Sequence, residues 1–140
     1  MAGPFDLNDT AAYAAWRERK LADHPRSLDE LIVEVGDPRD LTAPERAALA
    51  DRVARCNMAI YAGRTRDDAD KDIVMALGRA FGLHRLDHNT GADEDAVTSL
   101  QISDAARHTG YIPYSNRPIA WHTDGYYNAP ERQIHGLVLH

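Results

Sequence analysis

Apolar residues recur at helical spacing in three stretches of the first half of the chain. The first predicted helix runs from about Thr10 to Asp23, after a cluster of N-capping residues and before Pro25. Thr42 and Glu45 have the spacing of a capping box and predict the start of a second helix. The apolar stripes predicted for these two helices are Tyr13, Trp16 and Leu21, and Leu49, Val53 and Cys56.

A third helix is predicted between two local signals. Thr65 with Asp68 is expected to cap its start, and Gly82 to end it, with Ala69, Ile73, Ala76 and Ala80 along one face. Short runs of β-branched and apolar residues predict strands at Leu31–Val35 and Met58–Ala62. Helices and short strands therefore alternate in this part of the chain.

Strands are expected to accumulate toward the C-terminus. Residues 98–102 alternate between apolar and polar, residues 119–124 have an extended pattern, and residues 134–139 form an apolar run suited to a buried strand. Residues 111–118 contain two prolines and favour an ordered loop. Helices followed by strands predict an α+β fold, in one domain spanning residues 1–140.

Composition narrows the classes of function. The chain has 140 residues and a net charge of −6, which argues against a nucleic-acid partner or an anionic membrane surface. It shows neither the basic and apolar regions of a signal peptide nor an apolar run long enough to span a membrane. The single cysteine, Cys56, excludes an internal disulfide and fits a reducing compartment. We therefore expect a cytoplasmic protein.

The candidate chemistry lies at His122-Thr123-Asp124. In extended backbone, residues i and i+2 point to the same side, so the imidazole and the carboxylate are predicted to lie side by side, with Trp121 and Thr123 facing the other way. One further histidine would complete the facial triad that holds Fe(II) and leaves open positions on it. A bare His-x-Asp triplet is more often a surface histidine beside a carboxylate. The sequence around the triplet is therefore needed to distinguish a metal site from a surface pair.

That surrounding sequence resembles the taurine dioxygenase-like (TauD/TfdA) family, and within it the gamma-butyrobetaine hydroxylase branch. In that branch His-Thr-Asp is followed by aromatics, a proline, a glutamine and a Leu-His pair. Here these features are His122-Thr123-Asp124, Tyr126-Tyr127, Pro130, Gln133 and Leu139-His140. The strong resemblance covers about residues 111–140, and residues 31–83 are similar more loosely.

The resemblance implies a double-stranded β-helix (jelly roll) preceded by helices, and an Fe(II)- and 2-oxoglutarate-dependent dioxygenase that hydroxylates or oxidatively cleaves a small organic substrate. His122 and Asp124 correspond to the first histidine and the carboxylate of the metal site. The family's distal histidine and the arginine that pairs with 2-oxoglutarate lie further along than His140. The chain is therefore expected to be the N-terminal portion of the oxygenase domain, inactive alone, with self-association or a partner chain completing the barrel.

Tyr114, Asn116 and Tyr126 are candidate substrate-binding residues. An aromatic at the offset of Tyr114 contributes in that branch to a cage for a quaternary ammonium group, while packing at a barrel mouth is the plainer interpretation. His135 and His140 are not expected to supply the third ligand. Two other functions stay open: a non-catalytic binding or assembly module that pairs with another chain, and a cupin-like metal enzyme without 2-oxoglutarate.

Overall fold

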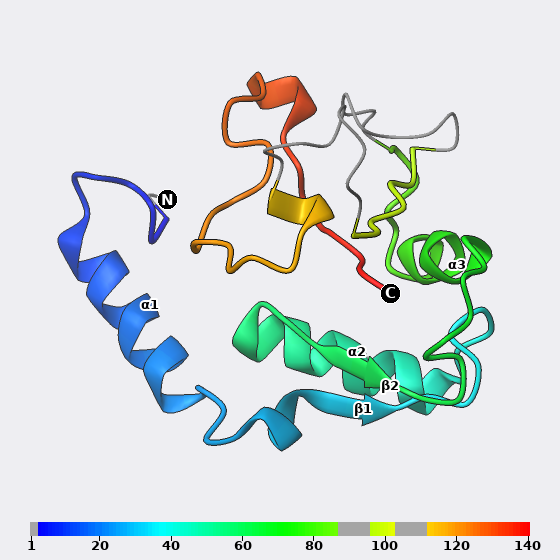
Figure 1. The fold of residues 1–140 in the computed structure, drawn as a ribbon. Coiled ribbons are helices and arrows are strands. Elements are labelled where there is room, and N and C mark those ends of the chain that lie inside the picture. The colour runs from blue at the N-terminus through cyan, green and yellow to red at the C-terminus, as the bar shows by residue number, and fades with distance from the viewer. Residues whose placement is uncertain (1–2, 87–95, 103–111) are drawn as a thin grey trace. The chain divides into compact units, whose positions relative to one another are not determined.

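The computed structural model describes residues 3–86, 96–102 and 112–140. Its helices and strands are α1 (Thr10–Ala22), β1 (Ile32–Glu34), α2 (Ala43–Cys56), β2 (Ile60–Ala62) and α3 (Asp72–Ala80), shown in Figure 1. Short 3-10 helices occupy Leu28–Leu31, Ile112–Tyr114 and Pro130–Arg132. The chain divides into two compact units: unit 1 runs to Gly82 and includes His140, and unit 2 runs from Leu83 to Leu139.

Unit 1 is organised by two parallel strands and the helix that connects them. β1 pairs with β2 in the register Ile32 to Ile60, Val33 to Tyr61 and Glu34 to Ala62. Parallel strands need a long crossover, and α2 provides it while packing against β1 (Figure 1). Val33, Val35 and Leu49 form the buried core between helix and sheet, with Leu41, Ala48, Ala59 and Tyr61 around them.

The start of α2 is tied directly to the end of β1. The predicted capping box is confirmed: the Glu45 carboxylate accepts hydrogen bonds from the Thr42 hydroxyl (2.6 Å) and the Thr42 backbone N–H (2.7 Å). The other Glu45 oxygen accepts from the Gly36 N–H at 2.8 Å. These bonds lower the pKa of Glu45, and they hold the β1–α2 connection in place.

Helix α1 has the predicted extent, but its apolar stripe is not buried. Asp9 caps it by accepting a hydrogen bond from the Ala12 N–H. Tyr13 is exposed, and Trp16 contacts only the rings of Phe5 and Tyr13 among the aromatic pairs of the described residues. The helix is instead held by Lys20, whose ammonium donates to the Ala54 and Arg55 carbonyls and to the Asn57 side chain at the end of α2.

The predicted start of the third helix was wrong. Asp68 does not cap it, because Arg39 binds the carboxylates of both Asp68 and Asp70. Those carboxylates also accept the N–H groups of Asp70 and Asp72, respectively, which keeps this segment in turns until α3 begins at Asp72. The end of the helix is as predicted, with Gly82 in the left-handed conformation at φ +81°.

The later strands of the prediction are not formed. Residues 98–102 and 134–139 have no strand pairing, and Ile102, Leu137 and Leu139 are exposed. Both segments have the residue pattern of strands, but a strand also needs a neighbour to receive its backbone hydrogen bonds. In the described part of the chain the sheet is the parallel pair alone. The jelly roll that the resemblance implies therefore stays a prediction.

Among the helices of residues 3–86, 96–102 and 112–140, none combines the length and the apolar character needed to cross a membrane.

Gly63 allows the end of β2 to approach the backbone of Val35 closely. An added Cβ at Gly63 would lie 2.3 Å from the Val35 carbonyl oxygen, in the same place where the Val35 N–H donates to the Ala62 carbonyl at 2.8 Å. Gly63→Ala is expected to lower the free energy of unfolding by about 1–3 kcal/mol, because the strand end has to move. Urea unfolding followed by circular dichroism measures this change.

Gly36→Ala is the matched control for that measurement. Its added Cβ would be 3.7 Å from a Glu45 oxygen, an ordinary contact, so a change within about 0.5 kcal/mol is expected. Equal destabilisation by the two variants would contradict the close-approach explanation.

Candidate functional site: a histidine–aspartate pair in unit 2

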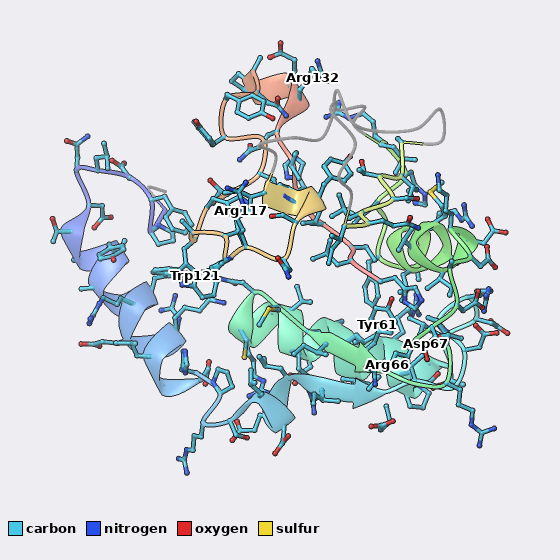
Figure 2. The ribbon with its side chains drawn as sticks, viewed as in Figure 1. Tyr61, Arg66, Asp67, Arg117, Trp121 and Arg132 are labelled. Carbon is cyan, nitrogen blue, oxygen red and sulfur yellow. The ribbon has the colours of Figure 1, made fainter. Side chains whose placement is uncertain are left out.

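The structure brings the side chains of His122 and Asp124 together, as the i, i+2 argument predicts. His122 Nε2 lies 3.2 Å from Asp124 Oδ1. The second ring nitrogen, Nδ1, lies 2.8 Å from the backbone carbonyl oxygen of Ala120. Both side chains are about half exposed, at 49% each, so an ion from solvent can reach them. Trp121, labelled in Figure 2, directly precedes His122 in the sequence and is fully exposed.

The hydrogen bond to Ala120 decides which ring nitrogen of His122 carries a proton. A carbonyl oxygen can only accept, so Nδ1 must be the donor. In a neutral imidazole Nε2 then has a lone pair, and that lone pair faces the carboxylate oxygen of Asp124. Two acceptors this close repel unless a cation lies between them. A second proton on His122 or a bound metal ion would meet this requirement.

The donor set fits a divalent metal. Neutral imidazole and carboxylate are ligands of first-row metals, and a metal-bound histidine usually donates its other N–H to a carbonyl or carboxylate, as His122 does to Ala120. Two ligands at right angles with bonds of about 2.1 Å are roughly 3.0 Å apart; the observed separation is 3.2 Å. No group of three histidine, cysteine or acidic side chains suited to a metal occurs among the described residues.

A tight turn follows Asp124 directly. Gly125 adopts the left-handed conformation at φ +64°, and its carbonyl accepts the Asn128 N–H at 2.9 Å. An added Cβ at Gly125 would be 2.5 Å from the Ile134 side chain, so only glycine fits both the backbone conformation and the space. The Asn128 amide then donates to the Arg132 carbonyl at 3.1 Å. Residues 125–134 thus fold back on themselves beside the histidine–aspartate pair.

The candidate substrate residues lie on either side of the pair in sequence. Tyr114 is half-buried at the end of a 3-10 helix, and Asn116 is exposed. Tyr126 is on the turn after Asp124, 81% exposed, with its ring edge-on to that of Tyr127 at a centroid distance of 5.3 Å. Among the described residues, no hydrogen bond joins Asn116 or Tyr126 to His122 or Asp124, so a role of these residues in substrate binding stays a prediction.

His140 is engaged elsewhere. Its Nε2 lies 2.9 Å from the Asp68 carbonyl oxygen and must donate to it, so Nδ1 accepts from the Tyr61 hydroxyl at 2.7 Å. The Tyr61 ring stacks on the imidazole at a 6° interplanar angle, and burial raises the pKa of Tyr61. With both nitrogens bonded, His140 has no lone pair to offer a metal. His135 and His84 are exposed, and His88 and His108 lie outside the described residues.

The sequence prediction missed the charged cluster around Arg39. Arg39 reaches the carboxylates of Asp37, Asp68 and Asp70, and its hydrogen bonds lower the pKa of Asp68. The pKa of Asp70 is lowered first by the Asp72 N–H and then by Arg39. The alternating aspartates at 68 and 70 were a visible signal, but their arginine partner is about thirty residues away in the chain.

Comparison of the chain with protein-family models, with curated proteins and with solved structures found no match.

The turn at Gly125 is expected to control the position of Asp124. Gly125→Ala adds about 1–2 kcal/mol of backbone strain and a clash with Ile134, so the carboxylate should shift away from His122 and Mn(II) affinity should fall. Electron paramagnetic resonance of free Mn(II) during a titration measures that affinity. Gly82→Ala is the control: it also has positive φ but lies in unit 1, so its affinity should be unchanged. An equal fall in Mn(II) affinity in both variants would contradict the proposal that the turn at Gly125 positions Asp124.

Proposed function

We propose that His122 and Asp124 are two protein ligands of the iron in an Fe(II)- and 2-oxoglutarate-dependent oxygenase that acts on a small organic substrate. One observation carries the proposal: His122 Nε2 and Asp124 Oδ1 lie 3.2 Å apart, and the bond of Nδ1 to the Ala120 carbonyl directs Nε2 toward the carboxylate, so the two atoms can bind the same cation. The resemblance of residues 111–140 to the TauD/TfdA family supplies the identity of the metal and co-substrate.

The chain's own residues would prepare the metal position. Ala120 keeps the proton on Nδ1 of His122, which leaves Nε2 free to bind and fixes the ring orientation. Asp124 offers a negative charge that offsets part of the charge of a divalent ion. When bound, Fe(II) with 2-oxoglutarate and dioxygen supplies the oxidising power to functionalise a C–H bond. The third protein ligand and the anchor for the far carboxylate of 2-oxoglutarate are assigned here only by the resemblance.

A substrate surface would lie on the turn that follows the metal ligands. Tyr126 and Tyr127 present aromatic rings to solvent next to Asp124. Aromatic faces attract cationic groups and pack against apolar ones, and both fit a small organic substrate. Tyr114 and Asn116 are the further candidates from the preceding loop.

A second candidate function is a binding or assembly module without catalysis. It is favoured by the exposed apolar side chains of unit 2, which include Ile119, Trp121, Leu137 and Leu139. All four are more than half exposed, and surface of this kind commonly marks an interaction site. Metal binding separates the two candidates, because a module of this kind has no need of the histidine–aspartate pair.

Mn(II), a redox-stable substitute for Fe(II), is expected to bind weakly and through this pair. Two ligands supply only part of a normal coordination shell. His122→Ala and Asp124→Ala should each lower the affinity by at least about tenfold in an anaerobic titration. His135→Ala removes an exposed histidine of the same unit and should leave the affinity unchanged. If wild type and His122→Ala bind Mn(II) equally, the metal-site assignment fails.

2-Oxoglutarate is expected to raise the apparent Mn(II) affinity of the wild type. Its 2-oxo and adjacent carboxylate oxygens can chelate the positions that the chain leaves open, so the two ligands should bind cooperatively. Glutarate, which lacks the 2-oxo group, should have no such effect, and His122→Ala should abolish it. If Mn(II) binding depends on His122 but its affinity does not change when 2-oxoglutarate is added, a cupin-like metal enzyme is favoured instead.

A further inference from the structure

A groove in unit 1 is lined by two arginines, Arg46 and Arg79, whose side chains make no hydrogen bond or ion pair within the described residues. Its volume is about 510 Å³, within the range of small-molecule sites. It is lined by the loop Arg39–Leu41, by Ala43 and Arg46 in the first turns of α2, and by Ala76, Arg79 and Ala80 in α3. All of these residues belong to unit 1 and are far in sequence from the histidine–aspartate pair.

The three arginines of the groove differ in their partners. Arg39 is bound to Asp68 and Asp70, with its guanidinium 2.9 Å from the Asp70 carboxylate. Arg46 and Arg79 are exposed, and within the described residues neither side chain has a hydrogen bond or an ion pair. A guanidinium is always charged at neutral pH and offers a planar set of donors that matches a carboxylate or a phosphate. Two such groups are therefore available at one concave surface.

The rest of the lining is mostly apolar and small. Leu41 and the alanines at 43, 76 and 80 provide small apolar side chains in the same lining as the two arginines. Asp40 is the one carboxylate of the lining, beside the three arginines. Asp68 and Asp70 do not line the groove, and their charges are already met by Arg39 and by backbone N–H groups.

The position of the groove in the fold also favours a ligand. The Arg39–Leu41 loop follows the carboxyl end of β1, and in parallel α/β arrangements ligands bind in the crevice outside the carboxyl ends of the strands. The N-terminal end of α2, which carries Arg46, lies in the same lining, although its partial positive charge is already met by the Glu45 carboxylate. The two arginines therefore lie beside the loop that follows the carboxyl end of a strand.

We propose that this groove binds a small organic anion, with two carboxylates or a phosphate on a short apolar body, and that Arg46 and Arg79 hold its charged ends. The site is separate from the metal pair and does not depend on the function proposed for that pair.

Calorimetric titration of the full chain, without metal and at constant ionic strength, tests this with two probes: succinate as a dicarboxylate and inorganic phosphate. Saturable binding of at least one is expected, and Arg46→Gln and Arg79→Gln should each weaken it about tenfold. Arg66→Gln is the matched control, because Arg66, labelled in Figure 2, is an exposed arginine of unit 1 that does not line the groove. The affinity of this variant for both probes should equal that of the wild type.

A third variant tests the apolar wall without changing charge. Ala76→Leu places a larger side chain in the groove and should reduce succinate binding more than phosphate binding, since succinate needs more space. Circular dichroism confirms that each variant is folded. No saturable heat with either probe, or an equal loss of affinity in Arg66→Gln and Arg46→Gln, would overturn the proposal. Binding of one probe only would support it and identify the anionic group preferred.

Discussion

The parallel pairing of β1 with β2 is the constraint on which unit 1 depends. Two adjacent parallel strands cannot be joined by a tight turn, so α2 must cross between them, and its Leu49 then completes a core with Val33 and Val35. Glu45 joins the start of that helix to Gly36, at the end of β1. Few apolar side chains are buried in this core. The strand pairing and the Glu45–Gly36 hydrogen bond are therefore important for holding α2 against the two strands.

Parallel strands also place the loops that follow them at the same edge. The loop after β1 carries Arg39, and the loop after β2 carries Asp68 and Asp70, so residues distant in sequence form one charged network. Isolated surface ion pairs contribute little to stability, but an arginine shared between several carboxylates restrains both loops together. His140 is bonded to the same segment through the Asp68 carbonyl. The groove with Arg46 and Arg79 opens beside these loops.

The histidine–aspartate pair of unit 2 has a different physical origin. It depends on neighbouring residues: Ala120 for the protonation of His122, and Gly125 for the turn after Asp124. A site of this kind can form without a large core, which agrees with the exposure of the apolar side chains around it. The pair directs an imidazole nitrogen and a carboxylate oxygen toward each other at 3.2 Å, which is the local geometry on which the proposed metal site depends.

The features that the sequence alone determined are those with local causes. The capping box at Thr42, the stop at Gly82 and the side-by-side placement of His122 and Asp124 follow from backbone geometry within a few residues. Features that need a distant partner were decided by the tertiary structure. Asp68 does not cap α3 as predicted, because its carboxylate binds Arg39 instead. Residues 134–139 have the apolar pattern of a strand, but they form no strand because no neighbouring strand receives their backbone hydrogen bonds. Local periodicity contains no information about which remote group supplies the hydrogen bonds.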